Sequence, residues 1–266
     1  MVGVLGVSAS AILVRFSQAP SGVTAAYRLG WTVLLLLPVV LLRCRAELRR
    51  VTARDLVLCG ASGVLLALHF LTWFESLKRT SVASSTVLVS TEVIFTALGF
   101  ALFLHGKIPR LGVWAILLAF GGSALLALSG GGGAGELSGN LLALAAASAA
   151  AVYTLIGRIQ RGHLSTTVYT FLTYLACFLT LLLGTAAAGT PLTGYGGREW
   201  LIGLALAVLC TLLGHSLFSW CLKYLSPSYV SAAKLCEPVF SSLAAIPLFG
   251  EVPGPLQLAG GAAVLG

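Results

Sequence analysis

The sequence predicts an all-α membrane protein whose chain crosses the bilayer ten times, in two inverted repeats of five helices. Three observations predict this class, and they exclude soluble enzymes, nucleic-acid-binding proteins, secreted disulfide scaffolds and disordered chains. Hydrophobic residues make up 58% of the 266 residues and charged residues only 9%, whereas a soluble domain carries roughly 25% charged residues. The apolar runs are about 20 residues long, which is the length that a helix needs to cross a bilayer. Polar landmarks of the first half also recur in the same order in the second half.

Short segments that contain proline or glycine separate the apolar runs. Pro20, Pro227 and Pro253 lie at three of these breaks, and glycine dominates residues 130–135; both residue types commonly interrupt helices. We therefore expect helices over residues 2–17, 22–42, 55–77, 81–104, 110–129, 138–157, 166–188, 199–222, 227–249 and 253–266. The first five helices form one repeat, residues 1–129, and a glycine-rich linker over residues 130–137 leads to the second repeat, residues 138–266.

The lysines and arginines at the helix ends predict the orientation in the membrane. If the N-terminus is cytoplasmic, ten of them lie at inner ends: Arg43, Arg45, Arg49, Arg50, Arg54, Lys107, Arg110, Arg158, Arg161 and Lys223. Four then lie at outer ends: Arg15, Lys78, Arg79 and Arg198. Because cytoplasmic ends carry the excess of these residues, we expect a multi-pass protein of the cell inner membrane with both termini in the cytoplasm.

The two halves share residues at matching intervals. His69 precedes Glu92 by 23 residues, and His215 precedes Glu237 by 22. Two further matches are Arg15 with Arg158, and Gly106-Lys107-Ile108-Pro109 with Gly250-Glu251-Val252-Pro253. An odd number of helices per repeat inverts the second copy, and inverted repeats are typical of secondary transporters whose substrate site lies near the bilayer midplane. The last helix ends earlier than its counterpart, so we expect the natural chain to be a little longer at both ends.

Several of these segments resemble a known family. Glu237-Pro238-Val239-Phe240, Leu248-Phe249-Gly250-Glu251 and Gly260-Gly261 resemble the second repeat of EamA-type transporters of the drug/metabolite transporter superfamily, and Ala25-Ala26-Tyr27-Arg28 resembles their first repeat. The resemblance implies export or exchange of small metabolites, of which amino acids are one common class. The chain departs from the family at Lys107, where a glutamate usually follows the glycine.

Five ionisable residues are expected near mid-span: His69, Glu92, His215, Lys234 and Glu237. Each needs a reason to be there, because a charge at the bilayer centre costs at least about 2.5–3.5 kcal/mol. Lys234 and Glu237 lie three residues apart on one helix face and are expected to form an ion pair, either structural or in substrate binding and gating. Glu92 is expected to be protonated or to meet His69, and the histidines either relay protons or link helices. Pro238 is expected to kink its helix at this depth.

Arg28 and four aromatic residues complete the candidate site. Arg28, near the outer end of its helix, either binds a substrate carboxylate with its guanidinium or extends outward to the interface. Tyr27, Trp73, Tyr169 and Trp220 recur at related places in the two halves. Such residues either line a substrate cavity or anchor helix ends at the membrane surface.

Two other functions compete with transport. Gly60-Ala61-Ser62-Gly63 contains the serine arrangement of a rhomboid-like intramembrane protease, for which His215 would be the base. Close packing of small residues between helices explains the same residues better, because the second half does not repeat the serine. The third hypothesis is a structural membrane protein that transports no solute. We favour a secondary transporter by alternating access, not an enzyme, because the midplane charges are duplicated and no ATP-binding motif is present.

The expected partners follow from this reading. They are a small-molecule substrate and the lipid bilayer, without nucleic acid, and the chain is expected to act as a monomer. Protons are a further partner if the embedded Glu and His residues exchange them, whereas uncoupled facilitation needs none. The six cysteines show no regular spacing, so neither a metal nor another cofactor is expected.

Overall fold

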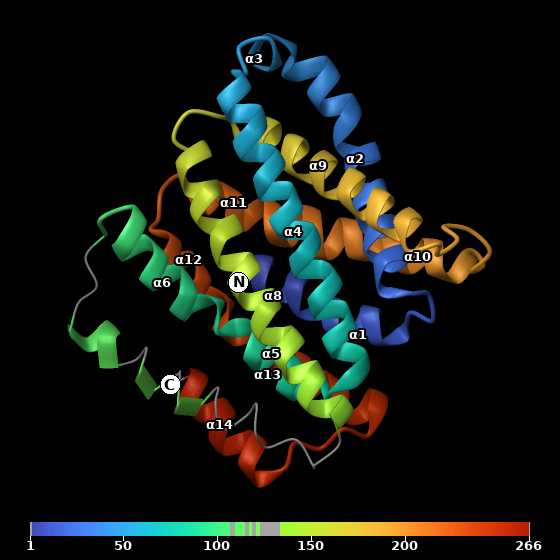
Figure 1. The fold of residues 1–266 in the computed structure, drawn as a ribbon, viewed down its shortest axis with the longest axis vertical. Helices are drawn as coiled ribbons and strands as arrows, with labels where there is room; N and C mark the ends of the chain where they lie inside the picture. The colour runs from blue at the N-terminus through green and yellow to red at the C-terminus, as the bar shows by residue number, and fades with distance from the viewer. Residues whose placement is uncertain (1, 107–109, 115–116, 119–120, 123–133, 266) are drawn as a thin grey trace.

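The computed structural model describes residues 2–106, 110–114, 117–118, 121–122 and 134–265 (Figure 1). Every regular element in these residues is helical. The elements are α1 (Val2–Phe16), α2 (Ser21–Arg43), α3 (Arg45–Leu48), α4 (Ala53–Arg79), α5 (Val82–Ser90), α6 (Glu92–Phe103), α8 (Ala134–Gln160), α9 (Thr166–Ala187), α10 (Gly197–Ala205), η1 (Leu206–His215), α11 (Ser216–Cys221), α12 (Pro227–Ala233), η2 (Lys234–Cys236), α13 (Glu237–Phe249) and α14 (Pro255–Leu265). The predicted all-helical class is therefore confirmed for the described part of the chain.

Among the described residues, seven helical segments are long and apolar enough to cross a membrane. They span Ser21–Arg43, Ala53–Arg79, Val82–Phe103, Gly135–Gln160, Thr166–Ala187, Gly197–Cys221 and Pro227–Phe249. The expected helices over 2–17 and 253–266 are present as the shorter α1 and α14. Most of the expected helix over 110–129 lies outside the described residues, so the count of ten stays a prediction.

Side chains just ahead of the helices explain where several of them begin. Thr52 and Asp55 form a reciprocal capping box at the start of α4. Ser81, Ser165 and Ser226 each accept a hydrogen bond from the backbone N–H three residues later, at the starts of α5, α9 and α12. Each of these bonds satisfies a backbone donor that the first turn of a helix leaves without a partner.

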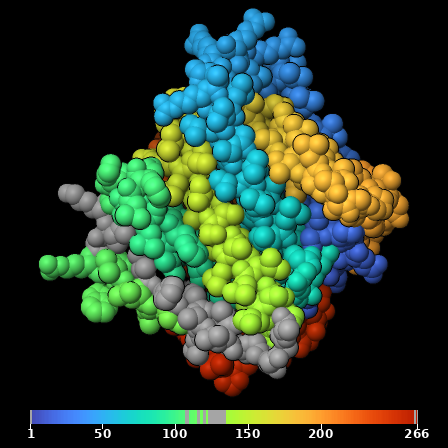
Figure 2. Space-filling view, in the orientation of Figure 1, coloured from blue at the N-terminus to red at the C-terminus, as the bar shows by residue number. Residues whose placement is uncertain are grey.

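The two halves of the chain are interleaved. Helix α4 of the first half packs along α8 and α9 of the second half, and α1 packs against η1. Figure 2 shows α8, in yellow-green, between α4 and α6 on the same face of the molecule. The largest contacts therefore join the two halves, so both halves together form one helical bundle.

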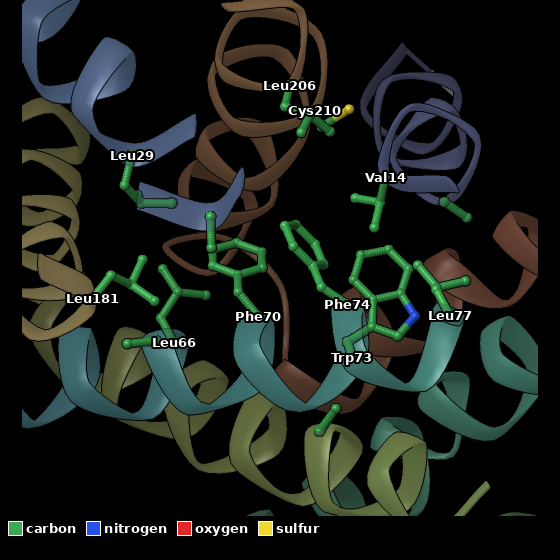
Figure 3. Packing of buried hydrophobic residues seen from close by; sticks show 14 of the residues in the cluster. Val14, Leu29, Leu66, Phe70, Trp73, Phe74, Leu77, Leu181, Leu206 and Cys210 are labelled. Atoms are coloured by element: carbon green, nitrogen blue, oxygen red, sulfur yellow. The ribbon is translucent and has the colours of Figure 1, made fainter. Parts of the chain in front are cut away.

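One face of α4 forms the centre of the core. Leu66, Phe70, Trp73 and Leu77 repeat at helical spacing and are buried, as is Phe74. Figure 3 shows them facing residues of four other helices: Val14, Leu29, Leu181, Leu206 and Cys210. Outside this core many large apolar side chains are exposed, including Leu42 and Phe103 at 81% and 77%, which suits a surface that meets lipid.

The helix kink predicted at Pro238 has a counterpart in the structure. The proline lies in the first turn of α13, where its missing N–H costs no helical hydrogen bond. The expected kink therefore takes the form of the short 3-10 turn η2, which stands between α12 and α13.

Candidate functional site

The membrane helices are interrupted at four of the five expected midplane residues; the exception is His69, which lies within α4. Glu92 is the first residue of α6, directly after a break at Thr91 that ends α5. His215 ends the π-helical segment η1, and Lys234 opens the 3-10 turn η2 that precedes Glu237. Interruptions leave backbone groups without helical partners, which lipid does not tolerate but a polar cavity does. Breaks at this depth are also where transporters place their substrate sites.

One cavity collects all five of these ionisable residues. Its lining consists of Val7, Ser10, His69, Trp73, Val89, Ser90, Glu92, His215, Ser231, Lys234 and Glu237. These residues come from both halves of the chain. The free volume is about 30 Å³, which holds about one water molecule. In this conformation the cavity is therefore too small for a metabolite.

The strongest contact in the cavity joins Glu92 and Lys234. The Lys234 Nζ lies 3.0 Å from both carboxylate oxygens of Glu92, and the two side chains are only 13% and 8% exposed. Thr154 and Ser231 also donate hydrogen bonds to Glu92, at 2.8 and 3.2 Å. The expected ion pair between Lys234 and Glu237 is wrong. Glu92 offers the lysine a carboxylate that two hydroxyls already stabilise, and it lies in the other half of the chain.

Glu237 is the carboxylate that this network leaves free. It is 8% exposed and lines the cavity, yet in the described part of the chain its side chain has neither a hydrogen bond nor an ion pair. A buried carboxylate without a partner is costly, so the position suits a group that receives a proton or a cationic part of a substrate.

The two histidines lie together in the cavity wall. Their ring centroids are 6.4 Å apart in an edge-on arrangement, and the His69 ring stacks on Trp73 at 5.7 Å. The Nδ1 of His69 donates to the backbone carbonyl of Ala146, at 3.0 Å. His69 therefore links α4 to α8, which is one of the two roles expected for the histidines. It is not the hydrogen-bond partner of Glu92.

Arg28 lies behind the cavity wall, fully buried. Its Nε donates to the hydroxyl of Thr211 at 2.7 Å and its Nη1 to the hydroxyl of Ser10 at 3.0 Å, and Ser10 lines the cavity. The guanidinium stands 4.2 Å above the ring of Phe70. Its Nη2 has no hydrogen-bond partner among the described residues. Outward extension of Arg28 to the interface is therefore wrong, because the side chain is 0% exposed.

The four aromatic residues of the predicted site lie at different places in the structure. Only Trp73 lines the central cavity. Tyr27 stacks on Trp200 at 4.0 Å and lines a separate apolar hollow. Tyr169 is buried between helices, and Trp220 is 50% exposed on the surface. Of the two expected roles, lining the central cavity therefore applies to Trp73 alone among these four in this structure, since repeat-related positions in the sequence face different neighbours in the two halves.

Ser62 does not form the arrangement of a protease. Its hydroxyl shares a hydrogen bond of 2.9 Å with the phenol of Tyr169, whereas His215 lies beside His69 and Phe70. The described residues include no hydrogen bond between Ser62 and His215. A Cβ on the adjacent Gly63 would stand 2.5 Å from the Cβ of Ala176, so the small residues here allow α4 and α9 to pack closely.

The sequence alone did not indicate the hydroxyl residues of the site. Ser10, Ser231, Thr154 and Thr211 all bond to its charged groups. Serine and threonine are common in membrane helices, where they also bond to the backbone of their own helix. Their spacing therefore carries no signal until the charged partner is known.

Spanning helices that break around a small, charged cavity define a membrane carrier. The chain belongs to the EamA-like transporter family, which matches residues 1–128 and 137–266. It is therefore a multi-pass membrane protein of a transporter family, as the sequence predicted, and its substrate is a small molecule.

Individual relatives agree with this assignment. The pseudopaline exporter CntI of Pseudomonas aeruginosa strain UCBPP-PA14 is 24% identical over 203 residues, which cover 76% of this chain and 70% of that exporter. The same exporter from strain PAO1 matches with the same identity and coverage. A protein of known crystal structure shares the fold, with a TM-score of 0.72 and 18% identity over 99% of this chain and 92% of that protein.

Proposed function

We propose that the chain is a secondary transporter that exports or exchanges small organic metabolites, such as amino acids, across the cytoplasmic membrane. The observation that carries the proposal is the small cavity between the two halves, which contains five ionisable side chains, four of them at helix breaks. A carrier that exposes one site to each side in turn needs such a site at the interface of the moving parts.

Equivalent contacts in the two halves support the proposed architecture. Arg15 donates to the carbonyl of Leu77 at the end of α4, and Arg158 donates to the carbonyl of Leu222 just after α11. Both pairs join the end of the first helix of a half to the end of its third. The proposal includes ten helices, with residues 1–129 and 138–266 as inverted repeats around the linker 130–137, and both termini in the cytoplasm.

The charges around the cavity favour a substrate with both an acidic and a basic group. Lys234 and the buried Arg28 supply positive charge, and Glu92 and Glu237 supply negative charge. A zwitterion would bring one carboxylate and one ammonium group and so compensate charges of both signs. Trp73 offers an apolar ring face beside them. The export function named for the Pseudomonas relative supports the direction of transport in this proposal.

Counterflow in proteoliposomes tests the function directly. Vesicles preloaded with a mixture of amino acids and small organic acids and amines are exposed to isotope-labelled counterparts, and uptake is read by mass spectrometry. We expect uptake of compounds that carry both an amino and a carboxylate group. Monodisperse, correctly inserted protein that moves none of these compounds would contradict the proposed substrate class. Repeating the assay with and without a pH gradient separates proton exchange from uncoupled facilitation.

A further inference from the structure

An ion pair at one end of the bundle joins the two halves of the chain. The guanidinium of Arg15, in the last turn of α1, pairs with the carboxylate of Glu251, which follows α13. The other carboxylate oxygen accepts a hydrogen bond of 2.7 Å from the backbone N–H of Val82. The Arg15 guanidinium also lies 5.8 Å from the centre of the Phe249 ring. Three segments of the chain therefore meet at Glu251, and both of its oxygens have partners.

The position of Glu251 is favourable for reasons beyond the ion pair. Val82 is the first residue of α5, so its N–H is one of the donors that a helix start leaves unpaired. A carboxylate at that point also interacts favourably with the positive end of the helix dipole. The side chains of Arg15 and Glu251 are 27% and 19% exposed, so solvent screens their attraction only in part.

The opposite end of the bundle has a counterpart of Arg15, but the sequence there has no counterpart of the Glu251 carboxylate. Arg158, the counterpart of Arg15, donates to the carbonyls of Leu222 and Lys223, and among the described residues it has no ion pair. The counterpart of Val82 is Pro227, which also follows a capping serine but has no N–H to offer. In the sequence, Lys107 replaces the glutamate; it lies outside the described residues.

Other contacts between the halves are present at both ends at once. Glu199 accepts hydrogen bonds from the hydroxyl of Ser17 and the backbone N–H of Gln18 at one end. At the other end, Asp55 accepts from the side chains of Gln160 and His163. Contacts that coexist at both ends do not oppose one another, so they can persist while the carrier changes state. A contact found at one end only favours the state in which that end is closed.

We propose that Arg15 and Glu251 form a gate that closes the outer end of the central cavity, and that among the described residues Arg158 forms no matching ion pair at the inner end. The inference rests on the alternating access proposed above. It predicts a carrier that, without substrate, favours the state closed to the outside and therefore loads from the cytoplasm. The opening of the outer end then requires the loss of the ion pair and of the Val82 hydrogen bond.

Thiol accessibility measures this bias without a known substrate. Ser90 lines the cavity, and its hydroxyl bonds only to the backbone of its own helix, so Ser90→Cys is a mild change. The six native cysteines are replaced by Ala or Ser, and the introduced thiol is labelled with a membrane-impermeant maleimide from either face. We expect Glu251→Gln to raise the labelling rate from the outer face about tenfold, a usual size for coupling to a two-state equilibrium. Arg15→Gln should do the same, and the double variant should add little because both changes break one contact.

Glu75→Gln is the matched control. Glu75 pairs with Arg79 at the same end, but both residues lie on α4 and so the pair joins no two halves. We expect this variant to leave the outer labelling rate unchanged. Equal outer rates with and without Glu251→Gln, in protein that labels from the inner face, would overturn the gate and leave the proposed site standing. A thiol that labels from neither face in any variant would overturn the proposed central site as well as the gate.

Discussion

Lys234 and Glu92 lie 142 positions apart in the chain, yet the lysine ammonium is 3.0 Å from both oxygens of the glutamate. This contact joins the second half of the bundle to the first inside the small cavity. A buried pair of this kind is costly to break on one side only, because the remaining charge loses its compensation. In the proposed mechanism a substrate with charged groups of its own replaces these interactions, so we expect the pair to couple binding to the separation of the halves.

The ion pair of Lys234 with Glu92 should contribute to the free energy of unfolding. We expect Glu92→Gln and Lys234→Met each to destabilise the purified protein by about 3–5 kcal/mol, since each leaves one buried charge alone. The double variant should recover much of this loss because it leaves no charge behind. Thermal unfolding in detergent, followed by tryptophan fluorescence, measures all three. Additive losses in the double variant would show that the two residues do not depend on each other.

Glu237 should behave differently from Glu92. Because Glu237 is buried without a partner in the described structure, we expect Glu237→Gln to leave the unfolding temperature unchanged or to raise it. Transport should nevertheless weaken, because a lost hydrogen bond to a charged group costs about 1.5–3 kcal/mol, or roughly tenfold to a hundredfold in apparent affinity. Counterflow at several substrate concentrations gives the affinity. Full transport by Glu237→Gln would remove this carboxylate from the proposed site.

Arg28 tests the recognition of an acidic group. Arg28→Lys keeps the positive charge but loses the planar fork that binds a carboxylate with two hydrogen bonds. We expect counterflow of carboxylate-bearing compounds to fall at least about tenfold, the effect of roughly 1.4 kcal/mol. Amines without a carboxylate, if carried, should be affected less. An equal loss for both groups of compounds would instead assign Arg28 a structural role, through its bonds to Thr211 and Ser10.

Two neighbouring glycines on α4 give a paired test of helix packing. A Cβ on Gly63 would lie 2.5 Å from Ala176 and 2.6 Å from the carbonyl oxygen of Thr173, whereas a Cβ on Gly60 would meet nothing within 4 Å. We expect Gly63→Ala to destabilise the protein by about 1–3 kcal/mol through overpacking. Gly60→Ala should be neutral or stabilising by up to about 1 kcal/mol, because alanine favours the helix.

Thermal unfolding distinguishes the two glycine variants, with the unsubstituted chain as reference. Equal effects of both substitutions would contradict the close approach of α4 and α9. Ser62→Ala belongs to the same series. It should cost only about 0.5–1.5 kcal/mol, for the lost hydrogen bond to Tyr169, and it should leave counterflow intact. If the unsubstituted protein cleaved a membrane peptide and Ser62→Ala did not, that result would instead support the protease hypothesis.

Composition and spacing in the amino-acid sequence were enough to predict the class of this protein and most of its described helices. Long apolar runs require helices because lipid offers no partner to an exposed backbone, and the matching intervals around His69 and His215 indicated the duplication. The sequence also identified the five ionisable residues that the cavity collects, since a charge inside an apolar run is costly wherever the run packs. These conclusions depend on local composition and spacing, which the sequence contains in full.

The contacts between charged side chains of different helices could be read only from the three-dimensional structure. Within one helix Lys234 has Glu237 three residues away, but the bundle brings Glu92 of the other half within 3.0 Å and gives it two further donors. In the same way the burial of Arg28 and the ion pair of Arg15 with Glu251 depend on helices far apart in the chain. The free energy of a buried charge depends on every group around it, and these neighbours are set by how the helices pack, which spacing along one helix does not contain.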